Sequence, residues 1–311
     1  MRFPATAAVA LLASLAAPVA AREPKPVIAV TFDDLPAHSA LPPDTTRVEI
    51  ARKTIAAFKA QRIEVYGFVN GNQIASEPAS APVLDMWRAA GLPLGNHGWR
   101  HLSLNQASLA DYLADIDRTD AFIAPKMRGR DWHWFRYPFL AEGDDPAKRI
   151  EVRKALAARG YRIAQVTIGF GDYMWNEPYA RCVAAGDQAA IATLEATYLR
   201  AAAENAAATR KDARALYGRD IPYVLLMHIG AFDARMLPRL LAQYRAEGFR
   251  FTTLARAEAD PVYAADVNPA LPPAPPVWDR MNAKGLKPTP TEDFSKMLDS
   301  LCRPPSNPPA Q

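Results

Sequence analysis

The chain has 311 residues, half of them apolar, with a formal net charge of +4 and a pI near 9.0. This length can bury a large core, either as one large domain or as two modest ones. Lysine and arginine are scattered along the chain rather than clustered, so the sequence has no nucleic-acid-binding footprint, and we expect no such partner.

The first 21 residues have the pattern of a secretory signal peptide. One arginine precedes a short apolar run, and Val19 and Ala21 occupy the −3 and −1 positions before a cut ahead of Arg22. An uncleaved anchor is the alternative, although the run is short and Ala-rich for a membrane span. We expect a chain exported to a periplasm or the extracellular space, without stable membrane insertion after signal cleavage.

Strand-like and helix-like runs alternate over residues 22–260. The predicted strands are 27–32, 63–70, 92–97, 132–139, 161–170, 221–228 and 249–254. The predicted helices are 46–61, 81–91, 108–125, 145–160, 188–216 and 234–248. Repeated strand–helix units predict a parallel sheet with helices outside it, and seven of them favour a closed β/α barrel over an open sheet.

The composition changes after residue 260. Residues 261–311 contain twelve prolines and little apolar periodicity, which predicts an extended tail that packs on the barrel and has a disordered end. Cys182 and Cys302 fit an oxidising compartment as one disulfide, but two unrelated thiols fit the sequence nearly as well. A bridge closing so long a loop would stabilise the fold by about 4–5 kcal/mol.

Reactive side chains gather where the predicted strands end. In parallel α/β folds the chemistry is found at the carboxyl ends of the strands. Five predicted strands end in, or just before, residues that can ligate, titrate or orient: Asp33 and Asp34, His97 and His101, Arg136, Asp172 and Trp175, and His228. Loops selected only for turning would rarely share this property, so the pattern predicts an active site.

A metal site is the first interpretation of this cluster. His97 and His101 are spaced i, i+4, which places both on one face of a helical turn, although such a pair alone is a weak signal. With one aspartate they match the donors of a catalytic Zn²⁺ site that keeps open positions. Of Asp33 and Asp34, one would then bind the cation, which offsets their repulsion, while the other takes a proton from water. Because strand neighbours point to opposite faces, the strand must end or turn here.

The remaining polar residues have two interpretations each. His228 follows a buried-strand pattern, so it is either a satisfied core residue or a general acid. Asp172 would orient this histidine and raise its pKa, and Arg136 would brace the base and lower its pKa, yet both also fit structural ion pairs. His38 either lines the site or faces water, and His133 is predicted to pack in the core. Trp132, Trp134 and Trp175 are candidates for a sugar-stacking platform, but the strand positions of Trp132 and Trp134 favour core packing.

Five short motifs occur in the same order as those of a known family. They are "TFDD" (31–34), "HGWRH" (97–101), "RYPF" (136–139), "DYMW" (172–175) and "LMH" (226–228). Through them the chain resembles the NodB-type polysaccharide deacetylases, carbohydrate esterase family 4, over roughly residues 26–255. The resemblance implies a distorted (β/α)7 barrel as the catalytic domain over 22–260, followed by a Pro-rich C-terminal extension over 261–311.

The resemblance also implies a role for each reactive residue. Asp33 would be the base and His228 the acid. Asp34, His97 and His101 would hold a divalent metal, most simply Zn²⁺.

Further residues would support this chemistry. Arg136 would tune the base and Asp172 would support the acid. The backbone N–H of Phe139 would stabilise the oxyanion, while Leu226 and Trp175 would line the pocket for the acetyl methyl group.

The expected activity is metal-dependent hydrolysis of an acetyl group, most simply an N-acetyl amide, from a polysaccharide or oligosaccharide. Three alternatives stay open: an O-acetyl carbohydrate esterase on the same site, a mononuclear iron oxygenase with the same ligands, and an inactive exported carbohydrate-binding protein. Gly98 replaces the serine or threonine usual in the second motif, which leaves the rigidity of that loop in question. The sequence names neither the glycan nor the oligomeric state.

Overall fold

A computed structural model describes residues 25–303 of the chain. The predicted signal peptide over residues 1–21 lies outside this range, as does the end of the Pro-rich extension after residue 303. Within the described range, the helices are too short or too polar to cross a bilayer.

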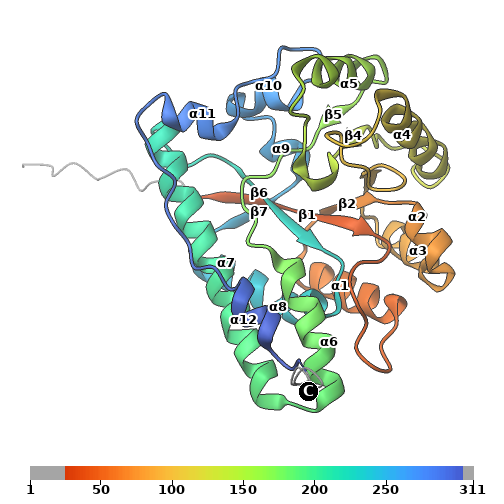
Figure 1. Ribbon diagram of the computed structural model, residues 1–311, viewed down its shortest axis with the longest axis vertical. Coiled ribbons are helices and arrows are strands. Elements are labelled where there is room, and N and C mark those ends of the chain that lie inside the picture. Colours follow the sequence, from red (N-terminus) through yellow and green to blue (C-terminus); the bar gives the residue numbers. More distant parts are fainter. Residues whose placement is uncertain (1–24, 304–311) are drawn as a thin grey trace, which may run out of the picture.

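The strands form one parallel sheet in the order β5-β4-β3-β2-β1-β6, and β7 pairs with the first residues of β1 (Figure 1). They are β1 (Val27–Leu35), β2 (Val65–Val69), β3 (Leu94–Asn96), β4 (Trp134–Phe135), β5 (Arg162–Ile163), β6 (Tyr223–His228) and β7 (Arg250–Thr252). Because β1 and β6 are buried neighbours in register, Asp33 lies directly opposite His228. Two of the predicted strand-end residues are therefore brought together by the sheet itself.

A single bridge closes the ring of strands. A strand was predicted over 161–170, but only two parts of this segment pair with other strands. They are β5 and Ile168, which forms an isolated parallel bridge with Leu225 of β6. The Ile168 N–H donates to the Val224 carbonyl, and the Leu226 N–H donates to the Ile168 carbonyl. The chain after β5 therefore pairs with β6, and the predicted distorted (β/α)7 barrel is confirmed.

Helices surround the barrel (Figure 1). They are α1 (Arg47–Gln61), α2 (Asn72–Ser76), α3 (Pro82–Ala89), α4 (Leu109–Ile123), α5 (Pro146–Ala158), α6 (Asn176–Ala185), α7 (Gln188–Tyr217), α8 (Ala231–Ala246), α9 (Leu254–Ala257), α10 (Ala264–Val267), α11 (Val277–Asn282) and α12 (Ser295–Ser300). Ser108 caps α4 by accepting from the Asp111 N–H, at the first residue of the helix predicted over 108–125. The sequence did not predict α6, which follows the "DYMW" motif directly.

The predicted strand over 132–139 is much shorter than expected. β4 has two residues, and the chain then enters a 3-10 turn, Pro138–Leu140, in which Phe139 and Leu140 have positive φ. Core packing is confirmed for Trp134, which is buried, but not for His133, which is half-exposed and hydrogen-bonded to Asp131. Its position before the strand, rather than inside it, explains this difference.

From α11 to α12 the C-terminal extension runs along α7 and forms a strap, residues 277–302 (Figure 1). The hydroxyl and N–H of Thr289 both donate to Asp212, and the Arg200 guanidinium lies 5.0 Å from the ring centroid of Phe294. The strap ends in a disulfide between Cys182 of α6 and Cys302. Packing on the barrel was therefore correctly predicted, but the described part of the extension also forms short helices.

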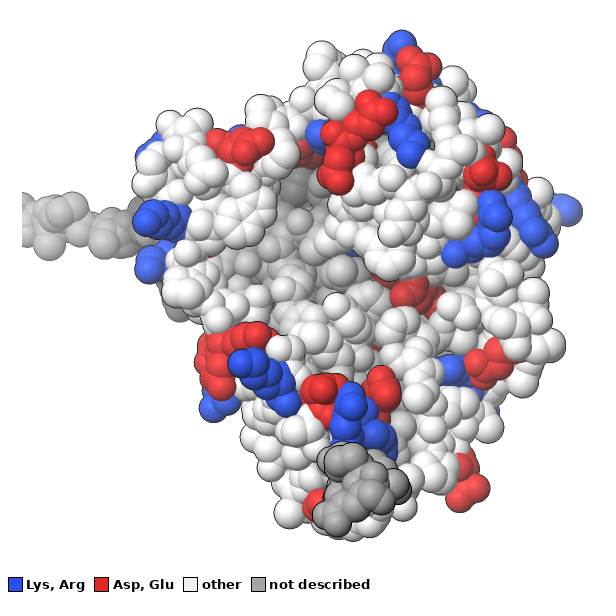
Figure 2. Space-filling view, viewed as in Figure 1, with Lys and Arg blue, Asp and Glu red and all other residues white. Residues whose placement is uncertain are grey.

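Charged residues of both signs are interspersed on the face shown in Figure 2, and no basic stripe crosses it.

Candidate active site

The two adjacent aspartates stand at the end of β1. Asp34 adopts a φ of 62°, and the pairing of β1 with β2 shifts register between Phe32 and Leu35. The Ala37 N–H donates to the Asp34 carbonyl and closes a turn. This break in the strand alternation lets Asp33 and Asp34 both line one cavity. The strand turns at Asp34 itself, as the sequence requires.

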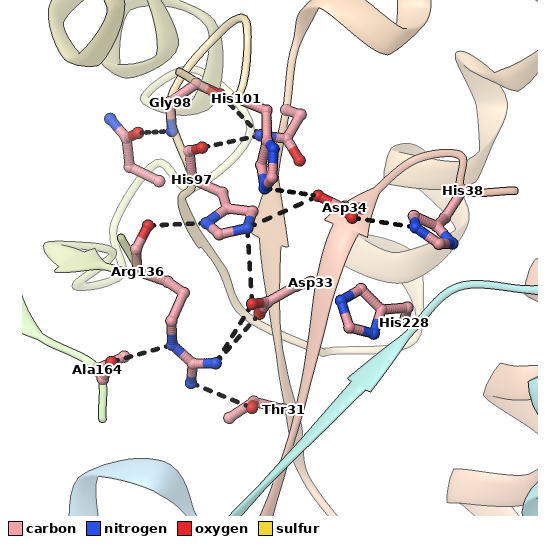
Figure 3. A network of polar contacts seen from close by, with 12 residues as sticks. Thr31, Asp33, Asp34, His38, His97, Gly98, His101, Arg136, Ala164 and His228 are labelled. Atoms are coloured by element: carbon pink, nitrogen blue, oxygen red, sulfur yellow. Dashed lines mark hydrogen bonds and ion pairs between the residues drawn. The ribbon is translucent and has the colours of Figure 1, made fainter. Parts of the chain in front are cut away.

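Asp34, His97 and His101 form a cluster that could hold a metal ion, with donor atoms all within 4.8 Å of one another. Asp34 Oδ1 lies 3.6 Å from His97 Nε2 and 3.5 Å from His101 Nε2 (Figure 3). Ligands of a tetrahedral zinc ion at its usual bond lengths stand about 3.4 Å apart. The donor types and spacings therefore fit a divalent cation such as Zn²⁺.

The histidines of this cluster are set up as neutral ligands. His97 Nδ1 lies 2.7 Å from the Arg136 carbonyl, which can only accept, so Nδ1 carries the proton and Nε2 is left to bind a cation. Burial lowers the pKa of both His97 and His101 to about 3. Burial raises the pKa of Asp34 to about 7, and a cation would oppose that shift.

The loop that carries these histidines is braced without the hydroxyl usual at Gly98. Asn70 Nδ2 donates to the carbonyls of His97 and Gly98, at 2.8 and 3.0 Å. The Gly98 N–H donates to Asn96 Oδ1 at 2.8 Å. Gly98 has a φ of 72°, which any residue with a Cβ adopts only under strain. Two buried amides thus take over the bracing, and the sequence reasoning missed both.

Asp33 is buried beside this cluster and is held by Arg136 (Figure 3). Arg136 Nη1 lies 3.4 and 3.3 Å from the two Asp33 oxygens, while its Nε donates to the Ala164 carbonyl. Burial raises the pKa of Asp33, and the opposing charges of Arg136 and His228 reduce this rise without cancelling it. Arg136 thus acts in the predicted direction, but the net pKa of Asp33 stays above its ordinary value.

His228 lies on the other side of Asp33 from Arg136 (Figure 3) and is paired with Asp172. Its Nδ1 lies 3.0 Å from Asp172 Oδ1, and its backbone N–H donates to Asp172 Oδ2 at 2.6 Å. Burial by itself would lower the pKa of His228, but the carboxylates of Asp172, Asp34 and Asp33 together raise it to about 10. His228 is therefore protonated at neutral pH, with Nε2 available as a donor.

These residues line one cavity of about 380 Å³. Its walls are Asp33, Asp34, His38, His97, His101, Phe139, Leu140, Tyr173, Leu226 and His228. Phe139 and Leu226 are both among these lining residues. His38 belongs to the site rather than to the solvent, because its Nε2 lies 3.5 Å from Asp34 Oδ2.

Trp175 does not line this cavity. Its indole is fully buried, and its Nε1 donates to Thr197 Oγ1 at 3.2 Å. Tyr173, two residues earlier on the 3-10 turn Asp172–Trp175, takes that place with 47% of its surface exposed. A turn of three residues places positions 173 and 175 on different sides, which the motif alone does not reveal.

Comparisons with known proteins find one family model and several solved structures that are similar to this chain. The family model "Polysaccharide deacetylase" matches residues 20–163. No curated protein matches the chain.

Solved structures of carbohydrate esterase family 4 have the same fold. A chitin deacetylase from the fungal pathogen Colletotrichum lindemuthianum has a TM-score of 0.51 at 18% identity, covering 81% of this chain and 89% of that one. A family 4 pseudoenzyme from Bacillus anthracis has a TM-score of 0.52 at 13% identity, covering 76% and 66%. A pseudoenzyme mutant with restored enzymatic activity has a TM-score of 0.52 at 14% identity, covering 76% and 68%.

Proposed function

We propose that this chain, which matches the polysaccharide deacetylase family model over residues 20–163, is a metal-dependent hydrolase that removes N-acetyl groups from a sugar chain. The observation that carries the proposal is the meeting, in one cavity, of the metal-binding cluster, a carboxylate outside that cluster and a protonated histidine.

Asp34, His97 and His101 would hold a divalent cation, which we propose to be Zn²⁺ because the donors are two imidazoles and one carboxylate. When bound, such a cation supplies Lewis acidity, which polarises an amide carbonyl and makes water more acidic.

Asp33 is the proposed base. It is not one of the three proposed ligands, but it lies beside them, with its Oδ2 3.6 Å from His97 Nε2. Arg136 fixes its orientation, and the raised pKa of Asp33 makes it a better proton acceptor than an exposed aspartate. It would take the proton of the attacking water.

His228 is the proposed acid. It would donate a proton to the departing amine, and Asp172 holds it in the orientation in which Nε2 faces the cavity. Leu226 offers an apolar wall to the acetyl methyl group, and we assign the Phe139 N–H as a donor to the oxyanion.

The variant Asp33→Asn tests this assignment. It keeps the shape of the side chain but removes the base, so we expect deacetylation to fall by roughly 10²–10⁴-fold. The assay is mass spectrometry of N-acetylglucosamine oligomers, which reports loss of acetyl groups, with elemental analysis of the bound metal alongside. Asp44→Asn, at an exposed carboxylate, is the control. Near-normal activity of Asp33→Asn with metal bound would refute the role of this residue.

The same experiment separates the alternatives. O-acetylated oligosaccharides assayed beside the N-acetylated ones distinguish an esterase from an amidase on one site. Iron without zinc in the metal analysis would favour the oxygenase. Bound metal without turnover of either substrate would favour an inactive carbohydrate-binding protein, which is relevant because a pseudoenzyme has the same fold.

We further propose that the chain acts outside the cytoplasm. The signal-peptide pattern over residues 1–21 supports this, as does the bridge between Cys182 and Cys302, since disulfides persist in oxidising compartments.

A further inference from the structure

A second cavity, of about 350 Å³, adjoins the candidate active site. It is lined by Ser39, Ala40, Tyr173, Met174, Glu177, Pro178, Arg181, Ser295, Leu298 and Asp299. The two cavities share Tyr173, and the chain passes from one to the other between His38 and Ser39. A long molecule bound in the active-site cavity would therefore extend into the second cavity by lying across the Tyr173 side chain.

The C-terminal extension builds one wall of this second cavity. Ser295, Leu298 and Asp299 all come from α12, which lies beside α7 in Figure 1. The described part of the strap is thus more than a support for α7, because it supplies surface beside the site.

Several contacts hold α12 in this position. Arg181 Nη2 donates to the carbonyls of Leu298 and Leu301, at 3.0 and 3.1 Å. The disulfide from Cys182 to Cys302 ties the end of the strap to α6. The ring of Phe294, just before α12, lies 5.8 Å from that of the buried Trp175. The wall is therefore fixed before any ligand arrives, which lowers the entropic cost of binding.

The lining suits a neutral, hydroxyl-rich molecule. Ser295 offers a hydroxyl, while Glu177 and Asp299 offer carboxylate acceptors for hydroxyl groups. The formal charges are already balanced, since Glu177 lies 3.4 Å from Arg181 and Asp299 pairs with Arg303. The exposed Tyr173 ring adds an amphipathic face of the kind that packs against the C–H face of a sugar.

We propose that this second cavity is a subsite for the sugar unit next to the one being deacetylated, built in part by the C-terminal extension. The proposal rests on the proposed function and sharpens it: the substrate is an oligomer of N-acetylhexosamine units that spans both cavities. Binding energy gained at the neighbouring unit then assists the reaction at the acetyl group.

The variant Ser295→Trp tests the subsite. Ser295 is exposed on α12 and lines the cavity, so an indole at this position would fill it without disturbing the core. Ser300→Trp is the matched control, because Ser300 is exposed on the same helix but does not line the cavity. We expect Ser295→Trp to lower kcat/KM for the N-acetylglucosamine tetramer by roughly tenfold or more. Activity on the N-acetylglucosamine monomer should not change.

Calorimetric binding of the tetramer provides a second readout that does not need turnover. Weaker binding to Ser295→Trp than to Ser300→Trp supports the subsite, even if the wild-type chain hydrolyses no oligomer and the deacetylase proposal fails. Equal tetramer binding and turnover by the two variants overturns the subsite. Absence of tetramer binding to the wild-type chain overturns it as well.

The variant Cys302→Ser examines the same wall by another route. Without the disulfide, α12 keeps its Arg181 contacts but loses its covalent tie to α6. We expect a rise in KM for the tetramer with little change in kcat. An unchanged KM for the tetramer would show that the extension does not position the neighbouring sugar.

Discussion

The cluster histidines, His97 and His101, and His228 face the same cavity from two sides, and their surroundings give them opposite protonation states. On one side, burial lowers the pKa of His97 and His101 to about 3. On the other side, His228 is also largely buried, yet neighbouring carboxylates, Asp172 foremost, raise its pKa to about 10. The contrast lies within one cavity of about 380 Å³.

The difference follows from what each imidazole meets at Nδ1. His97 meets the Arg136 carbonyl, which fixes the tautomer without adding a full charge. His228 meets the carboxylate of Asp172, whose charge favours the imidazolium. A neutral ring has a lone pair to offer a cation, whereas a protonated ring has a proton to give. Histidine can thus serve as a metal ligand or as an acid in the same cavity, depending on whether its Nδ1 meets a carbonyl or a carboxylate.

The largest expected effect comes from removing a ligand of the proposed metal ion. Asp34→Asn removes the only charge among the three proposed ligands, so we expect metal content to fall and deacetylation to drop on the order of 10³-fold or more. Elemental analysis and the acetyl-release assay measure the two effects. Asp85→Asn, an exposed carboxylate paired with Lys126, is the control. Full metal content and activity in Asp34→Asn would remove this residue from the ligand set.

A smaller effect on activity is expected from removing the carboxylate that pairs with His228, the proposed acid. Asp172→Asn keeps the shape but removes the charge that favours protonated His228, so the pKa of His228 should fall from about 10 toward its ordinary value. The alkaline limb of the kcat/KM profile should move to lower pH, with a loss at pH 8 of up to roughly 30-fold.

A pH–rate profile of Asp172→Asn beside one of Asp117→Asn, an exposed carboxylate paired with Arg159, measures the shift. An alkaline limb at the wild-type position in Asp172→Asn would mean that Asp172 is structural only.

Much of this site could be predicted from the sequence because it depends on local order along the chain. Strand periodicity located β1 and β6, and parallel strands bring their carboxyl ends together, which predicts that Asp33 and His228 meet. The pairing of His228 with Asp172 was predicted from the same rule.

What the sequence did not reveal depends on tertiary contacts. The buried amide of Asn70, which follows β2, braces the histidine loop from the neighbouring strand, and no local pattern marks it. Which aromatic residue of "DYMW" faces the cavity is decided by the turn, so the site has Tyr173 where Trp175 was expected. The wall that α12 adds beside the site lies far away in sequence and follows a stretch with little periodicity.

The smallest expected effect concerns stability. The pKa of His228 is about 10 in the folded chain and about 6.5 in the unfolded chain. Because the folded state holds a proton that the unfolded state releases, its stabilising contribution is complete below about pH 6.5 and is lost as the pH rises through 10. Between pH 7.5 and 9.5 the free energy of unfolding should therefore fall by up to about 1.4 kcal/mol per pH unit on account of this residue.

Urea unfolding of wild type and His228→Gln over this pH range, with a chelator present to keep the cluster free of metal, measures that slope. The wild-type free energy of unfolding should decline more steeply with pH than that of His228→Gln. His133→Gln should follow the wild type, because His133 lies half-exposed at the other end of β4 from Arg136. Parallel curves for wild type and His228→Gln would mean that His228 is neutral in the folded chain. His228 would then not differ in protonation from the cluster histidines, and the acid would have to be another residue.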